Sequence, residues 1–161
     1  MINKIEQLKI KELSDYLHFQ AEDTFPALKD EHRLTMLAAK WYEHAEFCTC
    51  RDDSGQLVGM IAFYANQPET GIAYIPHIYV SPAYRGRGIF SQMLQRVVTN
   101  IKQKGYTSIK LEVSKDNMTA QKAYIKQGFQ FLPEKIGGVL HYIWRKIYNT
   151  SKTNSFLCSI V

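Results

Sequence analysis

Apolar side chains recur along this chain with two periods, one typical of helices and one typical of strands. A spacing of three to four residues marks one face of an amphipathic helix. This spacing predicts four helices, over 10–22, 28–45, 88–104 and 117–127. Alternating or β-branched runs predict seven strands, over 2–8, 46–50, 56–65, 72–80, 107–113, 129–132 and 139–148. The predicted order is therefore β-α-α-β-β-β-α-β-α-β-β, a mixed α/β (α+β) domain.

Turn-forming residues support these boundaries. Residues 52–55, Asp-Asp-Ser-Gly, separate two predicted strands as a hairpin turn. Gly105 and Gly128 follow two of the predicted helices, in the position favoured just beyond a helix C-terminus. Pro76 cannot donate a ladder hydrogen bond, so it indicates an interruption within the strand over 72–80.

A basic, glycine-rich turn joins that strand directly to the helix over 88–104. The first backbone N–H groups of a helix have no intrahelical partner, and the helix dipole places partial positive charge there. Gly86 and Gly88 let a ligand approach this backbone closely, and Arg85 and Arg87 add two positive charges. The stretch is therefore a candidate site for a diphosphate.

The turn resembles the acyl-CoA signature of the GNAT superfamily of N-acetyltransferases, Q/R-x-x-G-x-G/A. Arg85 matches the first position of that signature and Gly88 matches its central glycine. Phe90 departs from the final Gly/Ala. Residues 117–129 resemble a second family segment, N-x-x-A-x-x-x-Y-x-x-x-G-F, in which Tyr124 occupies the tyrosine position. The resemblance implies a mostly antiparallel, twisted central sheet that splays between two central strands and is flanked by helices.

The resemblance also implies acetyl-CoA as co-substrate, held by the turn and by the end of the preceding strand. The cofactor-binding residues expected from it are Tyr79, Val80, Arg85, Gly86, Arg87, Gly88, Ile89, Phe90, Ser91 and Asn117. Asn117 matches a family asparagine that contacts the CoA arm or caps a helix. Tyr124 matches the general-acid tyrosine, since a phenol can protonate the leaving thiolate. The alternative for Tyr124 is a packing role under the central helix.

The base that deprotonates the amine is less clearly marked in the sequence. An alkylamine with a pKa near ~10 is mostly protonated at neutral pH, so a base or a water relay is needed. His77 lies on the strand that faces the acceptor in the family, and its ordinary pKa of ~6.5 suits the task. Glu112, on the facing strand, is the second candidate, although alternation with Leu111 and Val113 predicts that it points outward.

Composition limits the remaining function classes. The chain has 161 residues, which suits one domain, and a net charge of +5. Because the positive residues are scattered, we expect no nucleic-acid partner. No apolar run approaches the ~20 residues that span a bilayer, and no secretory signal is evident, so we expect no membrane association and a cytoplasmic location. Cys48 and Cys50 are expected to pack on one face of a strand, and no metal site is expected.

The sequence thus predicts a single acetyltransferase domain over 1–148 and a C-terminal tail over 149–161 that is flexible or docked on a partner. The last four residues formally fit a prenylation pattern, which a chance match also explains. The acceptor would be the amine of a small molecule or peptide, and a homodimer is possible in this family. The alternative function is a non-catalytic acyl-CoA-binding regulatory module.

Overall fold

The computed structural model describes residues 1–24, 30–114, 116–136 and 139–147. The order of its elements is the predicted one. The strands are β1 (Ile2–Glu6), β2 (Glu46–Arg51), β3 (Leu57–Tyr64), β4 (Ile72–Val80), β5 (Ser108–Glu112), β6 (Gln130–Ile136) and β7 (Val139–Ile147). The helices are α1 (Ile10–Thr24), α2 (Glu31–His44), α3 (Ile89–Gln103) and α4 (Met118–Lys126), with short 3-10 turns η2 (Pro68–Thr70) and η3 (Pro82–Tyr84).

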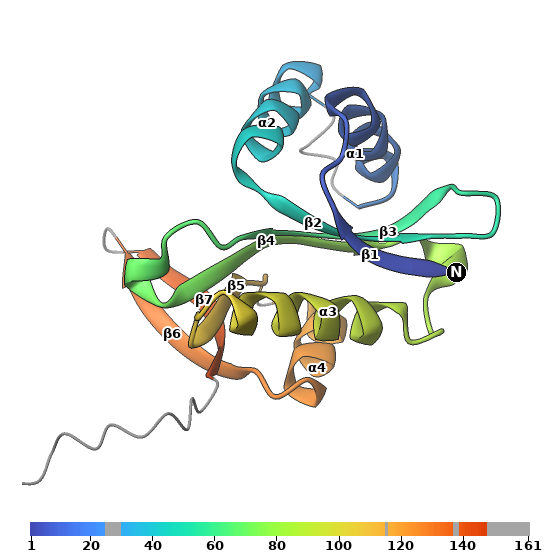
Figure 1. Cartoon of the computed structure of the whole chain (residues 1–161). Helices are drawn as coiled ribbons and strands as arrows, with labels where there is room; N and C mark the ends of the chain where they lie inside the picture. Colours follow the sequence, from blue (N-terminus) through green and yellow to red (C-terminus); the bar gives the residue numbers. More distant parts are fainter. Residues whose placement is uncertain (25–29, 115, 137–138, 148–161) are drawn as a thin grey trace, which may run out of the picture.

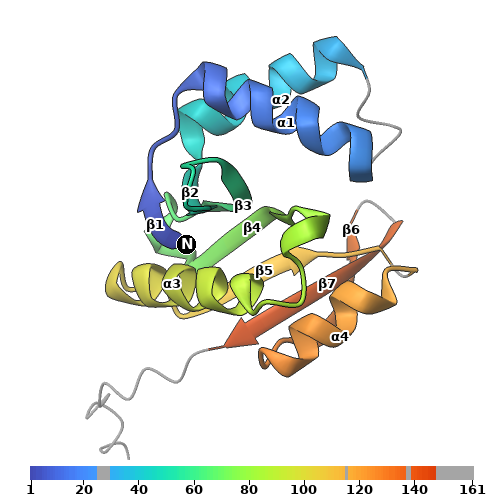
Figure 2. The same ribbon diagram turned by 90° about the vertical axis from the view of Figure 1, so that its right-hand side faces the viewer.

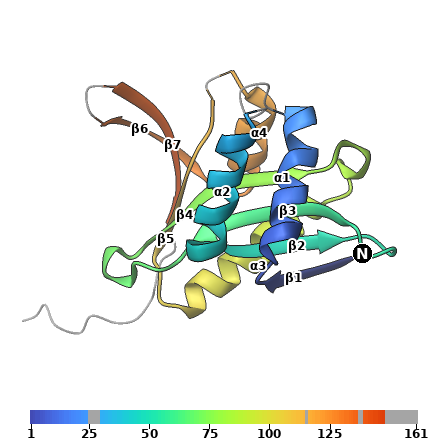
Figure 3. The same ribbon diagram turned by 90° about the horizontal axis from the view of Figure 1, so that it is seen from above.

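The seven strands form one sheet in the order β1-β2-β3-β4-β5-β7-β6. Every neighbouring pair is antiparallel except β4 and β5, which run parallel. Helices α1 and α2 cover one face, and α3 and α4 lie on the other (Figure 1). Seen from above, α1 and α2 lie across β2, β3 and β4 (Figure 3). The predicted mixed fold with a mostly antiparallel sheet is confirmed.

Each face of the sheet has its own hydrophobic core. The α3 side buries side chains such as Met93 and Val97 against β2, β3, β4 and β5. The α1–α2 side buries Leu13 and Trp41 against the opposite face. Cys48 and Cys50 are both fully buried and unbonded to each other, on the α3 side, as the alternation predicts. Two layers of helix enclosing one sheet thus account for most of the buried apolar surface.

Several boundaries differ from those predicted, for local reasons. Helix α2 begins at Glu31 rather than at 28 because Asp30 accepts hydrogen bonds from the backbone N–H groups of His32 and Arg33. Strand β6 runs to Ile136 rather than ending at 132, since it pairs with β7 along its whole length. The tail over 149–161, including its final Cys158, lies outside the described residues.

A β-bulge at Pro76 determines what β4 presents to each face. Ala62 pairs with His77, whereas Tyr64 pairs with Tyr74, so two residues of β4, Ile75 and Pro76, lie opposite the single residue Phe63 of β3. Residues before the bulge, such as Ile75, face the α3 core, while Tyr79 beyond it packs in the α1–α2 core. The proline therefore interrupts the strand, as predicted.

Strands β4 and β5 pair only over Ile72–Ile75 and Ser108–Leu111, and β4 then continues to Val80 without β5. Figure 2 shows the two strands diverging towards the side that carries α4 and the start of α3. The predicted splay between two central strands is therefore present, and it opens beside the glycine-rich turn.

Candidate active site

The glycine-rich turn is shaped by two residues in the left-handed region. Gly86 and Gly88 both have φ of 76°, a conformation that strains any side chain with a Cβ. Gly88 is the N-terminal cap of α3, and the first intrahelical bond runs from Gln92 N to Gly88 O at 3.1 Å. The N–H groups of residues 89–91 therefore have no intrahelical acceptor and are available to an anion.

Close packing holds this helix end against the sheet. A Cβ placed on Gly59 of β3 would lie 3.0 Å from Met93 Cε and 3.4 Å from Ile89 Cγ2. Ile89 itself is buried in the α3 core. The absence of a side chain at Gly59 thus lets the first turn of α3 approach the strand, which fixes the direction of its N–H groups.

The two arginines of the turn are held in different ways. Arg85 Nε donates a 2.8 Å hydrogen bond to Val80 O, and its guanidinium lies 5.6 Å from the centroid of the Tyr79 ring. Arg87 instead lies over the ring of Tyr84, at 5.2 Å from the centroid. Both charges thus stay beside the start of α3, where they reinforce the partial positive charge of the helix dipole.

Phe90 and Ser91 connect the start of α3 to α4. Gln127 Nε2 donates to Ser91 Oγ at 3.0 Å. The Phe90 ring meets the Tyr124 ring edge-on, with centroids 5.8 Å apart. The phenylalanine that departs from the family signature therefore turns its side chain towards α4.

Tyr124 lies in the α3 core with 9 % of its surface exposed. Its ring also packs on Phe129, with centroids 5.7 Å apart. Burial raises the pKa of Tyr124 to about 12, so the phenol keeps its proton at physiological pH. Asn117 caps α4, because its side-chain oxygen accepts from Ala120 N at 3.0 Å. The capping role proposed for Asn117 is therefore confirmed.

His77 faces the α1–α2 side of the sheet. Its Nε2 lies 2.5 Å from Oε1 of Gln20 on α1, and its ring lies 5.1 Å from that of Trp41 on α2. Burial lowers the pKa of His77 to about 4, so the ring is neutral near pH 7. Because Gln20 presents a carbonyl oxygen, Nε2 carries the proton and Nδ1 keeps the lone pair.

Glu112 lies on the same face, at the end of β5, and is exposed. Leu111 and Val113 point into the α3 core, so Glu112 points away from it, as the alternation predicts. The pKa of Tyr74 on β4 is raised mainly by burial and, to a smaller extent, by the charge of Glu112. The Tyr74 ring is stacked on Tyr64, with centroids 6.4 Å apart and planes at 2°.

The predicted site residues thus form two groups. The turn and Tyr124 lie on the α3 side of the sheet. His77 and Glu112 lie on the α1–α2 side, with the splay of β4 and β5 between the two groups. Tyr79, predicted to contact the cofactor, is buried with this second group. Sequence reasoning did not identify Gln20 and Tyr74. The tyrosines of strands 56–65 and 72–80 were visible as β-formers, but no local pattern pairs Gln20 with a histidine 57 residues away.

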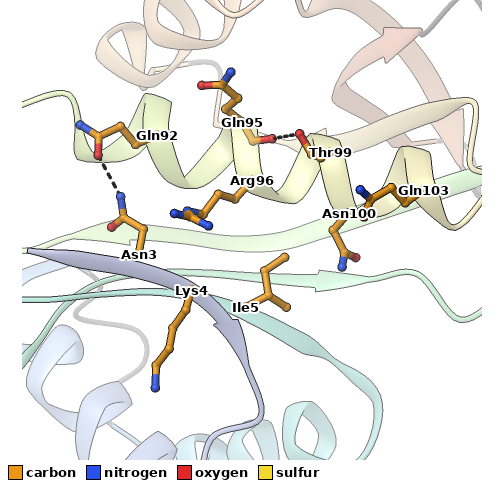
Figure 4. A pocket seen from close by; sticks show the side chains of 9 residues that line it. All are labelled: Asn3, Lys4, Ile5, Gln92, Gln95, Arg96, Thr99, Asn100 and Gln103. Atoms are coloured by element: carbon orange, nitrogen blue, oxygen red, sulfur yellow. Dashed lines mark hydrogen bonds between the residues drawn. The ribbon is translucent and has the colours of Figure 1, made fainter.

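A polar hollow of about 570 Å³ lies elsewhere, between β1 and α3. Arg96 projects into it from α3, between Asn3 of β1 and Asn100 (Figure 4). It contains none of the residues predicted for acyl-CoA or for catalysis.

Within the part of the chain that the structure describes, no helix is long and apolar enough to cross a membrane.

Comparison with known proteins shows what this site resembles. The profile of the Acetyltransferase (GNAT) family matches residues 12–129, which include both the turn and Tyr124. An uncharacterized N-acetyltransferase of Methanocaldococcus jannaschii is 28% identical over 103 residues, covering 57% of this chain and 45% of that protein. A mycothiol acetyltransferase of Renibacterium salmoninarum is 26% identical over 98 residues, covering 59% of this chain and 29% of that protein. The chain therefore spans less than half the length of these two relatives.

Solved structures share the fold at lower identity. The ribosomal-protein alanine N-acetyltransferase of Escherichia coli superposes with a TM-score of 0.73 at 16% identity, covering 95% of this chain and 98% of that one. The PaiA N-acetyltransferase of Thermoplasma acidophilum, in complex with coenzyme A, superposes with a TM-score of 0.67 at 20% identity, covering 92% of this chain and 100% of that one. At these identities the likeness concerns the fold.

Proposed function

Because this chain belongs to the GNAT acetyltransferase family, we propose that it transfers an acetyl group from acetyl-CoA to a primary amine by direct attack in a ternary complex. One observation carries the proposal. The anion-binding start of α3 and the buried phenol of Tyr124 are joined through the contact between Phe90 and Tyr124. The proposed diphosphate site and the proposed proton donor therefore lie next to each other on the α3 side of the sheet.

The cofactor would be held by backbone and charge. The N–H groups of residues 89–91, with Arg85 and Arg87 beside them, would bind the diphosphate of acetyl-CoA. The pantetheine arm would lie along β4 where that strand has lost its β5 partner, and would use the exposed backbone edge as an added strand does. That direction leads the thioester into the splay, towards Tyr124.

The chemistry needs one proton to leave nitrogen and one to reach sulfur. The neutral amine attacks the thioester carbon, a C–N bond forms, and the C–S bond breaks as the electron pair moves to sulfur. Tyr124 would donate its hydroxyl proton to the departing thiolate and regain a proton from solvent. The raised pKa of Tyr124 supports this role, because it keeps the phenol protonated until a thiolate is present.

For the base, the structure favours Glu112 over His77. Glu112 is exposed on the α1–α2 side, near Tyr74. It lies one residue beyond the part of β5 that pairs with β4. The Nε2 of His77 is occupied by Gln20, and its ring is enclosed against Trp41. In the proposal, the amine enters from the α1–α2 side, loses its proton to Glu112, and meets the thioester in the splay.

The test is release of CoA thiol from acetyl-CoA in the presence of a panel of primary amines, from small polyamines to peptides with a free N-terminus. The proposal expects acceptor-dependent thiol release and a product heavier by one acetyl group. The non-catalytic module, by contrast, would bind acetyl-CoA tightly and release no thiol with any acceptor. The departure of Phe90 from the family signature does not by itself favour that module, because the Phe90 side chain packs towards Tyr124.

A further inference from the structure

The tip of the β2–β3 hairpin contacts the turn that precedes α3. Asp52 Oδ2 accepts a 2.8 Å hydrogen bond from the hydroxyl of Tyr84, which is 32 residues further along the chain. The other carboxylate oxygen, Oδ1, accepts from Ser54 N at 2.9 Å, Ser54 Oγ at 2.6 Å and Gln56 N at 3.0 Å. The hairpin turn therefore fixes the carboxylate, and the carboxylate fixes the Tyr84 ring.

The other end of this chain of contacts is Arg87. Its guanidinium carbon lies 5.2 Å from the centroid of the Tyr84 ring, within the range of a cation–π interaction. The hydrogen bond to a carboxylate increases the electron density of the phenol ring, which strengthens its attraction for the cation. Among the described residues, no carboxylate lies within ion-pair distance of Arg87, so its charge remains available to a ligand.

We propose that Asp52 and Tyr84 are positioning residues, which hold the Arg87 guanidinium in place to bind the phosphates of acetyl-CoA. This inference rests on the proposed function. An arginine in a glycine-rich turn would otherwise lose the entropy of several side-chain torsions when it meets the phosphate. The hairpin limits that loss before the ligand arrives. Arg85 is held separately, by Val80 O and Tyr79, so the two arginines are positioned by different parts of the fold.

The Asp52 carboxylate stays ionised, and keeps its hydrogen bond from Tyr84, over the pH range in which CoA binding would be measured. Hydrogen bonds from Ser54 and then Tyr84 lower the pKa of Asp52 to about 2. Asp52 is therefore charged at any pH at which the protein would be assayed, and it accepts from Tyr84 throughout.

The experiment is a double-mutant cycle on CoA binding, measured by calorimetry. Tyr84→Leu removes the ring and should weaken CoA binding about fivefold, whereas Tyr84→Phe keeps the ring and should weaken it about twofold. Asp52→Ala removes the acceptor of the Tyr84 hydroxyl and should weaken CoA binding about twofold, as Tyr84→Phe does. Tyr106→Phe is the matched control, since the buried Tyr106 hydroxyl has no hydrogen-bond partner among the described residues and lies at the other end of α3.

The decisive comparison is the effect of Tyr84→Leu in the Arg87→Ala background. If Tyr84 acts through Arg87, Tyr84→Leu should scarcely change CoA binding once Arg87 has been replaced by alanine. Equal weakening in both backgrounds, or no weakening in the wild-type background, would overturn the inference while leaving the proposed function intact. Wild-type protein that binds no CoA would overturn both.

The contact between Arg87 and Tyr84 can also be measured in the free protein, independently of CoA binding. In the free wild type, the side-chain protons of Arg87 should show an upfield NMR shift from the Tyr84 ring. Tyr84→Leu should abolish this shift, and Tyr106→Phe should leave it unchanged. Arg87 protons at random-coil shifts in the wild type would contradict the proposed contact.

Discussion

The rings of Phe90 and Tyr124 meet edge-on, with centroids 5.8 Å apart and planes at 67°. One residue belongs to the first turn of α3 and the other to α4, so the contact ties the candidate phosphate site to the candidate general acid. An aromatic pair in this geometry contributes about 0.5–1.5 kcal/mol beyond the area that it buries. The residue that departs from the family signature thus has a structural role.

Phe90→Ala should therefore affect turnover more than CoA binding. We expect kcat to fall several-fold because Tyr124 loses the ring that orients it, and the free energy of unfolding to fall by about 2 kcal/mol, since Phe90 is only partly buried. The KM for acetyl-CoA should change little, because the backbone N–H of residue 90 remains. Phe90→Leu, which keeps an apolar contact, is the control. A large rise in KM with unchanged kcat would contradict this account.

Tyr124→Phe tests the general acid. Loss of the hydroxyl should lower kcat by about 10²-fold, with CoA binding kept, since the ring still packs on Phe90 and Phe129. Steady-state kinetics together with a CoA titration separate the two effects. Unchanged turnover would reduce Tyr124 to a packing residue.

Glu112→Gln and His77→Gln separate the two candidate bases. The proposal expects Glu112→Gln to lower kcat/KM for the amine at least tenfold at pH 7, and this loss should shrink as the pH approaches the pKa of the amine, where the base is no longer needed. His77→Gln should have the smaller effect, because His77 is enclosed by Gln20 and Trp41. The reverse order, in pH–rate profiles of the two variants, would make His77 the base.

His77 should also make stability depend on pH. Its pKa is about 4 in the folded protein against ~6.5 in the unfolded chain, so the unfolded chain binds the proton more tightly. The contribution is therefore fully present above pH ~6.5 and is lost as the pH falls towards 4. Between pH 7 and pH 5 the loss of this His77 contribution should be about 1–2 kcal/mol, measured by denaturant unfolding as the difference between the wild type and His77→Gln.

The His77→Gln variant should flatten this dependence between pH 7 and pH 5. Hydrogen bonds to Ser14 O and Glu31 raise the pKa of His18, so His18 acts in the same window with the opposite sign and is present in both proteins of the comparison. Glu6 and Asp52, whose carboxyl pKa values are lowered, act only at lower pH. A wild type and a His77→Gln variant with the same slope in this window would show that His77 does not titrate as described.

Much of this arrangement follows from short stretches of sequence. The order of elements, the glycines of the turn, the cap at Asn117 and the interruption at Pro76 each depend on residues within a few positions of one another. The pairing of His77 with Gln20 could not be predicted in this way, because it depends on how α1 crosses the sheet. The direction of Phe90 likewise depends on where α4 packs.

The bulge in β4 shows most clearly what the sequence pattern does not predict, namely which face of the sheet each side chain occupies. Strict alternation along 72–80 would place Ile75, His77 and Tyr79 on one face of the sheet. The extra residue at Pro76 instead moves His77 and Tyr79 to the α1–α2 side, away from Ile75. A proline in a strand indicates an irregularity, but only the register with β3 shows which side chains change face.

The most direct test of the central claim is a calorimetric titration of the wild type with acetyl-CoA, repeated on Gly88→Val. A β-branched residue at φ of 76° cannot keep the backbone that starts α3, so the variant should lose the anion site. Circular dichroism would establish that it stays folded. We predict saturable binding to the wild type and binding at least tenfold weaker to the folded variant. A folded wild type that binds neither acetyl-CoA nor longer acyl-CoAs would contradict the account and leave a resemblance of fold alone.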